Sequence, residues 1–187
     1  MRSRLVIGLA ALLAAALIAP TAHAATQLRQ VKVPIPGPNR PPSTTPGTMT
    51  LDFAFKNKRS SNRKFTPRQL TRIDFDQVPL LCMNAAGNGT TTLLLTTTMP
   101  VAVKVTKAPQ PAGKKPKRNR FAFRVTYTFP TFAGTLRVTI DKANHGPRRL
   151  RSQGMLNIQD LDADTDHVNC STGGPEQWGG LPVTLRQ

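Results

Sequence analysis

Apolar and polar residues alternate with period two over much of the chain, and this alternation predicts strands. Met49, Leu51, Phe53 and Phe55 alternate with more polar neighbours. The clearest segment covers residues 121–129, where aromatic and aliphatic side chains occupy every second position. Because successive side chains of a strand point to opposite faces, each segment predicts a strand with one buried face.

Similar but shorter patterns follow along the chain, and the threonine-rich run at 90–98 also favours strands. After Ala24, no stretch shows a sustained helical period of hydrophobic residues. Seven to nine strands separated by turn residues predict an all-β fold, an antiparallel β-sandwich or a barrel-like sheet. The further candidate strands are 73–82, 90–98, 101–105, 136–140, 155–158, 168–170 and 183–185.

Four segments interrupt the pattern and suggest the domain organisation. Residues 25–47 contain six prolines within thirteen positions, which predicts a stiff, disordered linker without regular strands. Residues 57–69 and 141–153 are basic and polar, as is typical of loops and turns. Residues 107–120 form a long basic loop. A single β-sandwich domain is therefore expected over 48–187.

The segment 1–24 has the three parts of a secretory signal peptide. Arg2 and Arg4 precede an apolar run that ends at Ala19, and Ala22 and Ala24 stand three and one positions before the expected cut. A membrane anchor is the alternative, but the run is shorter than the roughly 20 residues that span a bilayer. We therefore expect cleavage after Ala24, no transmembrane segment in the mature chain, and a location outside the cell or in the cell envelope.

Export gives the two cysteines a structural meaning. Cys82 and Cys170 both lie in the mature chain, and an even number of cysteines outside the cell favours a disulfide. We predict an intramolecular bond between them. An intermolecular bond and two free thiols are the alternatives.

The charge is unevenly distributed. The chain carries 26 basic and 9 acidic residues, a formal net charge of +17, and cleavage after Ala24 would leave +15. Residues 25–151 hold 23 of the basic residues and only 4 of the acids, whereas residues 152–187 hold 1 and 5. Such a balance points to anionic partners, and it also allows the acidic segment to lie beside a basic face.

The loop at 107–120 is the candidate polyanion-binding segment, because clustered cations attract polyanions. Teichoic acids, acidic glycans and extracellular DNA are the partners that this hypothesis names. A solvated loop that promotes solubility is the alternative. The loop lacks aromatic residues, so we expect no specific recognition of nucleic acid. The candidate binding residues are Lys114, Lys115, Lys117, Arg118 and Arg120.

Candidate catalytic and metal-binding residues are scarce. His145 and His167 are the only histidines left after cleavage, neither lies in a recognisable motif, and we predict no catalytic residue. Aspartates at every second position from Asp160 to Asp166 suit Ca²⁺ by composition. However, neither register gives the glycine and glutamate of an EF-hand loop, so we predict no metal site and no cofactor. An exposed strand face is the other interpretation of this run.

Short motifs resemble those of small secreted β-sandwich proteins of high-GC bacteria, many of them uncharacterised. The motifs are Val78-Pro79-Leu80-Leu81-Cys82, Phe132-Ala133-Gly134-Thr135-Leu136 and Cys170-Ser171-Thr172-Gly173, with Trp178 beyond. The chain departs from that family in the spacing of Gly173 and Trp178 and in the basic loop. The resemblance covers 48–187 and implies a fold and a compartment but no catalytic residues.

Together these patterns predict a secreted or envelope-associated, non-enzymatic β-sandwich with a binding or structural role. A polyanion-binding module is the narrower hypothesis. A secreted hydrolase with an unfamiliar site is the third.

Overall fold

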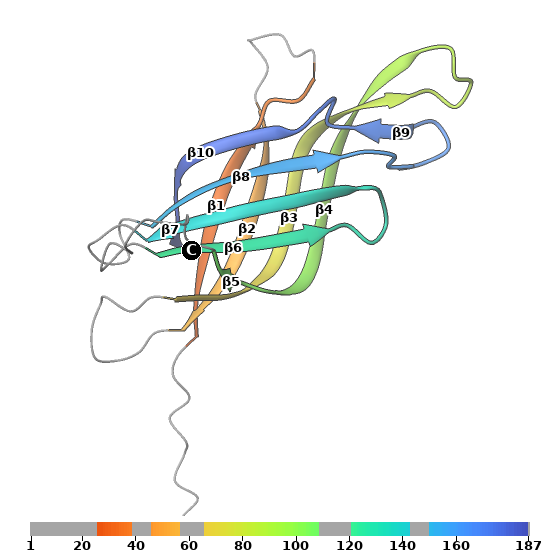
Figure 1. Ribbon diagram of the computed structural model, residues 1–187. Coiled ribbons are helices and arrows are strands. Elements are labelled where there is room, and N and C mark those ends of the chain that lie inside the picture. The colour runs from red at the N-terminus through yellow and green to blue at the C-terminus, as the bar shows by residue number, and fades with distance from the viewer. Residues whose placement is uncertain (1–25, 39–45, 57–65, 109–120, 143–149, 187) are drawn as a thin grey trace, which may run out of the picture.

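The structure is a computed structural model, and it describes residues 26–38, 46–56, 66–108, 121–142 and 150–186. The described residues form eleven strands and no helix (Figure 1). The predicted all-β class is confirmed. The count exceeds the seven to nine strands that we expected, partly because two of the strands, β5 and β11, are very short.

The strands form two antiparallel sheets that pack face to face. Sheet A has the order β11-β1-β2-β3-β4, and β9 also pairs with β3. Sheet B has the order β10-β8-β7-β6-β5. Sheet A contains β1 (Thr26–Ile35), β2 (Gly47–Lys56), β3 (Thr66–Met83), β4 (Thr90–Lys104), β9 (Val168–Ser171) and β11 (Thr184–Leu185). Sheet B contains β5 (Thr106–Lys107), β6 (Phe121–Thr128), β7 (Gly134–Lys142), β8 (Leu150–Ile158) and β10 (Glu176–Pro182).

The core lies between the sheets and follows the period-two pattern. The alternating apolar residues of β2 are fully buried, and those of β7 cover them from the other sheet with at most 1% exposure. All of them belong to one continuous apolar cluster. Alternation thus predicted the buried face of both strands, because burial of one face is what produces the pattern. The residues are Met49, Leu51, Phe53 and Phe55 of β2 and Leu136, Val138 and Ile140 of β7.

Strand β1 corrects the expected linker. Thr26–Ile35 pairs with β2 along its whole length, and Val31, Val33 and Ile35 are buried in the core. The prolines do not prevent this, because β11 pairs only with Arg29 and Gln30, so the rest of β1 is an edge among the described strands. An edge strand tolerates a proline whose nitrogen faces away from its partner. The expected linker residues 39–45 lie outside the described residues.

Several expected loop boundaries are also wrong. Strand β3 begins at Thr66, inside the expected loop 57–69, because Thr66 pairs with Lys56 of β2. Strand β8 begins at Leu150, inside the expected turn 141–153, because it pairs with β7. The candidate strands at 90–98 and 101–105 form one strand, β4. In each case a neighbouring strand supplies the hydrogen bonds that local composition does not reveal.

A glycine in β8 makes room for the tryptophan. Gly154 occupies a core-facing position, and a Cβ atom there would clash with the Trp178 ring and with the Arg137 carbonyl oxygen. Trp178 pairs with Gly154 across β10 and β8 and packs on the edge of the core. Sheet B therefore needs a residue without a side chain at position 154.

The predicted disulfide is confirmed. Cys82 of β3 and Cys170 of β9 are bonded through their sulfur atoms, and both residues are buried. Strand β9 continues the sheet alongside β3 beyond the point where β2 ends. The bond therefore joins the C-terminal part of the chain to sheet A.

Candidate anion-binding surface

Three exposed arginines lie on the outer face of sheet B. Arg124 belongs to β6, Arg137 to β7 and Arg151 to β8, and each alternates with buried neighbours on its own strand. The three strands are adjacent in the sheet. Alternation therefore brings cations that are well separated in sequence onto one surface.

Strand register places the three arginines around Thr139 of β7. Arg124 lies directly opposite Thr139, and Arg137 stands two positions from Thr139 on the same strand. Arg151 lies opposite Asp141, which stands two positions from Thr139 in the other direction. Adjacent strands are about 4.8 Å apart, and two positions along a strand span about 7 Å. We call Arg124, Arg137, Arg151 and Thr139 the arginine face.

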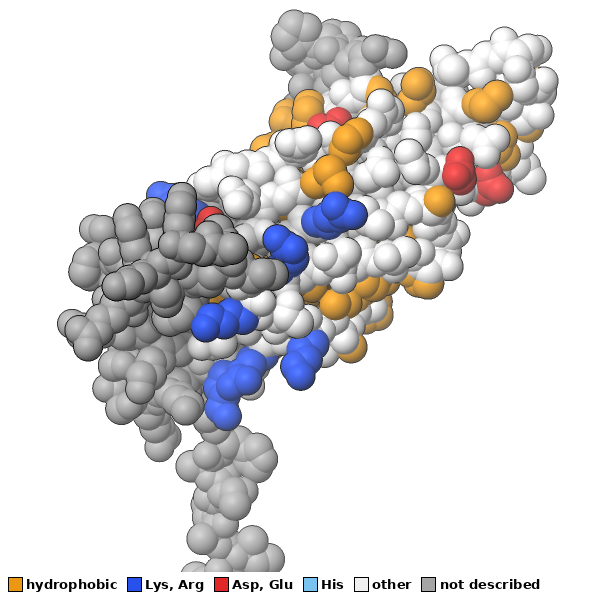
Figure 2. Space-filling model, viewed as in Figure 1, with side chains coloured by type: hydrophobic (Ala, Val, Ile, Leu, Met, Phe, Trp, Pro, Cys, Tyr) orange, Lys and Arg blue, Asp and Glu red, His pale blue; other side chains and the backbone are white. Residues whose placement is uncertain are grey.

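The charges of the arginine face are largely uncompensated within the described residues. Asp141 is an exposed acid beside it, but no salt bridge in the described part of the chain includes any of the three arginines. Arg151 donates a hydrogen bond to the Gly180 carbonyl oxygen at 3.4 Å. Figure 2 shows several Lys and Arg side chains and few acids over the side of the molecule where sheet B lies. The surface is therefore electropositive.

The expected basic loop is attached to the edge of this same sheet. Lys107, the first residue of the expected loop, instead belongs to β5, where it pairs with Phe123 of β6. The Ala108 amide donates to the Ala122 carbonyl oxygen. Ala108 and Phe121, which flank residues 109–120, therefore lie at the start of β6, whereas Thr106 lies opposite Arg124. The candidate residues Lys114, Lys115, Lys117, Arg118 and Arg120 lie outside the described residues, as does His145.

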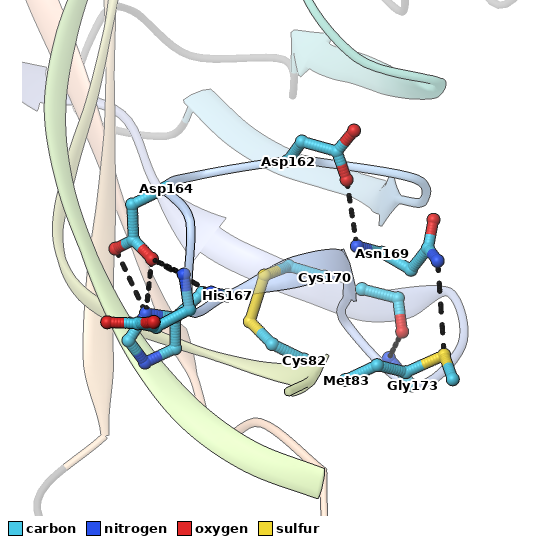
Figure 3. The surroundings of a disulfide bond; sticks show 10 residues. Cys82, Met83, Asp162, Asp164, His167, Asn169, Cys170 and Gly173 are labelled. Atoms are coloured by element: carbon cyan, nitrogen blue, oxygen red, sulfur yellow. Dashed lines mark hydrogen bonds and ion pairs between the residues drawn. A yellow bond between two sulfur atoms is a disulfide. The ribbon is translucent and has the colours of Figure 1, made fainter. Parts of the chain in front are cut away.

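The acidic run forms a turn rather than a strand. Asp164 accepts hydrogen bonds from the amides of Asp166 and His167, both at 2.8 Å, and its carboxylate lies 2.8 Å from His167 Nδ1 (Figure 3). The His167 contact first, and then the amide donors, lower the pKa of Asp164 below its ordinary value of 3.8. Asp162 accepts a hydrogen bond from the Asn169 amide.

Within the described residues, the same turn shows no group of metal ligands and no ion pair with the basic face. In the part of the chain that the structure describes, no three His, Cys, Asp or Glu side chains group as metal ligands. Among the same residues, no Lys or Arg forms an ion pair with an aspartate of this turn. In Figure 2 one group of acidic side chains lies at the β8–β9 end of the molecule, apart from the basic ones. The carboxylates of Asp162 and Asp164 instead hold the backbone of the turn.

The outer face of sheet A carries a separate, compensated polar cluster. Arg72 Nη2 lies 2.8 Å from Asp74 Oδ2, and the Thr98 hydroxyl donates a hydrogen bond to Asp74 Oδ1. These contacts lower the pKa of Asp74, and the hydrogen bond from Thr98 contributes most. Partial burial acts in the opposite direction and raises the pKa. Asp52 is only 3% exposed, and its Oδ2 lies 3.3 Å from Arg186 Nη1. Paired charges of this kind stabilise the sheet and leave little net field for a ligand.

Comparison with protein-family models, with curated proteins and with solved structures finds no match for this chain. The resemblance to small secreted bacterial proteins therefore stays a prediction. Within the described residues no helix has the length and apolar character to cross a bilayer. The signal peptide expected at 1–24 lies outside the described residues.

Sequence reasoning identified the basic loop but missed Arg124, Arg137 and Arg151 as site residues. For Arg124 and Arg137 the signal was available in part, because each lies on the polar face of a predicted strand, whereas Arg151 lies in the expected turn 141–153. The sequence alone does not give the register between neighbouring strands. That register places three arginines from separate strands around one threonine. Arginine forks can bind phosphate or carboxylate oxygens through two parallel hydrogen bonds. The arginine face thus has the chemistry of an anion-binding surface.

Proposed function

We propose that the protein is an exported, non-enzymatic binding protein that holds anionic cell-envelope polymers on the arginine face. The observation that carries this proposal is the exposed arrangement of Arg124, Arg137 and Arg151 around Thr139. The basic segment 109–120 would extend the same positive surface, since it starts and ends at the β5–β6 edge. A secreted or envelope location follows from the expected signal peptide and is compatible with the disulfide.

The chemistry favours a flexible polymer with repeated phosphates or carboxylates. The three cations of the arginine face can bind such oxyanions in a bidentate manner. In β6 the aromatic residues Phe123 and Tyr127 pack against the core rather than outward, so the described outer face of this strand offers no ring for stacking bases. Recognition by charge, with no reading of bases, is the expected mode.

Neutralising the arginine face provides the test. We expect the variant Arg124→Gln/Arg137→Gln/Arg151→Gln to bind poly(glycerol phosphate) teichoic acid more weakly than the unmodified chain. The slope of the logarithm of its binding constant against the logarithm of the salt concentration should be shallower by about one for each lost phosphate contact. Binding is measured by titration at several salt concentrations, with polygalacturonate as a carboxylate polymer for comparison.

A matched control separates position from total charge. Lys32, Lys56 and Lys104 are exposed residues of sheet A, and changing all three to Gln removes the same charge of three. This control should retain most of the affinity and slope. Equal losses in the two triple variants would contradict a localised site and leave only a bulk charge effect.

The loop is tested in the same assay. Neutral substitutions at Lys114, Lys115, Lys117, Arg118 and Arg120 should lower affinity further when combined with the arginine-face variant. Unchanged binding and an unchanged salt slope would remove the loop from the site. A hydrolase activity that disappears on substituting His145 or His167 would contradict the non-enzymatic proposal.

A further inference from the structure

Strand β4 leaves one long backbone edge open. It runs from Thr90 to Lys104 and forms the end of sheet A, with β3 as its partner. No other described strand pairs with its far edge. An open edge presents a row of N–H and C=O groups that can pair with another strand.

The position of a proline shows which backbone groups of β4 face that edge. Leu94 lies opposite Pro79 of β3. Directly opposite residues of an antiparallel pair either exchange two hydrogen bonds or none, and proline has no N–H to donate. Leu94 therefore directs its N–H and C=O away from β3, toward the open edge, and by alternation Thr92 and Thr96 do the same.

The sequence of this edge is a palindrome. Residues 90–98 are Thr-Thr-Thr-Leu-Leu-Leu-Thr-Thr-Thr, which is identical in both directions and has Leu94 at its centre. An antiparallel strand from a second copy, related by a twofold axis at Leu94, would place Leu94 opposite Leu94. Thr92 would then lie opposite Thr96. Every residue of the segment would meet its own type.

Exposure and charge also favour a second copy of the chain as the partner of the β4 edge. Leu94 is 53% exposed, the highest value among the exposed large hydrophobic residues of the described chain, and it lies at the centre of the palindrome. Residues 90–103 carry no charged side chain, although the whole chain has a net charge of +17. Copies that repel each other elsewhere could thus approach along this edge.

We propose that two copies of the chain pair through β4 in an antiparallel, twofold-symmetric arrangement centred on Leu94. The pairing would join two copies of sheet A into one continuous sheet, with the Leu94 side chains in contact on its outer face. Leu93 and Leu95, which pack against the edge of the core, would meet across the interface on the other face. A twofold interface is self-complementary and closes at two copies. The proposal is independent of anion binding on sheet B.

The twofold axis permits a test by complementary charges. Leu94→Lys places two lysines opposite each other, and Leu94→Asp places two aspartates opposite each other. We expect each variant alone to be monomeric in sedimentation equilibrium, while the unmodified chain forms dimers. An equimolar mixture of the two variants should form heterodimers, because the substituted side chain of one copy then meets the opposite charge.

Leu185 supplies a matched control at the other edge of the sheet. It is 50% exposed and lies on β11, so Leu185→Lys adds the same charge at a similarly exposed leucine. This variant should dimerise like the unmodified chain. Circular dichroism and the thermal midpoint of every variant establish that the fold is retained.

Three results would overturn the proposal. The first is an unmodified chain that stays monomeric up to its solubility limit. The second is a dimer that persists in both Leu94 variants, which would assign the contact to another surface. The third is an equimolar mixture of the folded L94K and L94D variants that remains monomeric.

Discussion

At the scale of single residues, Asp52 shows how a charged side chain can be buried on the polar face of a strand. Its side chain is 4% exposed, one carboxylate oxygen lies 3.3 Å from Arg186, and the other has no hydrogen-bond partner among the described residues. Removing the cation would leave a buried carboxylate poorly compensated. We expect Arg186→Ala to lower the free energy of unfolding by about 1–2 kcal/mol, since Arg186 is itself partly exposed.

Denaturant unfolding of Arg186→Ala measures this effect, and Arg186→Lys is the control that keeps the charge. The double variant Asp52→Asn/Arg186→Ala should lose less than the two single losses combined, because the pair is coupled. Strictly additive losses would show that the two side chains do not interact.

The Asp164 turn should respond to pH in a defined direction. The His167 ring contact and the amide donors lower the pKa of Asp164 below 3.8 in the folded chain. A lowered folded-state pKa means that the turn contacts are fully present above about pH 4 and are lost as the pH falls through the folded value. NMR titration of the Asp164 carboxyl carbon should give a midpoint below the ordinary one.

The variant His167→Ala removes the largest cause of that shift. The Asp164 midpoint should therefore rise toward 3.8, whereas Asp160→Asn should leave it unchanged. A midpoint that does not respond to the loss of His167 would contradict the contact.

At the scale of secondary structure, alternation predicted the strands whose two faces differ most. Residues 49–55 and 121–128 form parts of β2 and β6, as expected. Strand β1 was not predicted, although Val31, Val33 and Ile35 alternate in the same way, because the prolines of residues 25–47 indicated a linker. A single sequence does not show that β1 lies at an edge, where a proline is tolerated if its nitrogen faces away from the partner strand.

A substitution in β1 tests whether this segment belongs to the fold. Val33 is fully buried, so Val33→Ala should lower the free energy of unfolding by about 2 kcal/mol. Lys32 is exposed on the same strand, and Lys32→Ala should change stability by less than about 0.5 kcal/mol. Equal effects of the two variants in denaturant unfolding would favour the linker interpretation instead.

At the scale of the whole molecule, composition predicted an electropositive protein but not where its charges gather. The arginine face depends on register between β6, β7 and β8. In the compensated cluster, Arg72 and Asp74 lie two positions apart on β3, and Asp52 of β2 pairs with Arg186 near the C-terminus. Both sets follow the same alternation in sequence. The presence of an acidic partner in the folded chain decides which cations are neutralised and which remain available to a ligand.

The high net charge gives the two proposed contacts opposite responses to salt. Polymer binding replaces counterions on the polyanion, so its affinity should fall as salt rises. Self-association through β4 brings together two chains of charge +17, or +15 after signal cleavage, and screening weakens their repulsion. Dimerisation should therefore strengthen with added sodium chloride, as measured by sedimentation equilibrium without polymer. If dimerisation instead weakened with salt, charge pairs would hold the copies together, and the uncharged β4 edge would not be the contact.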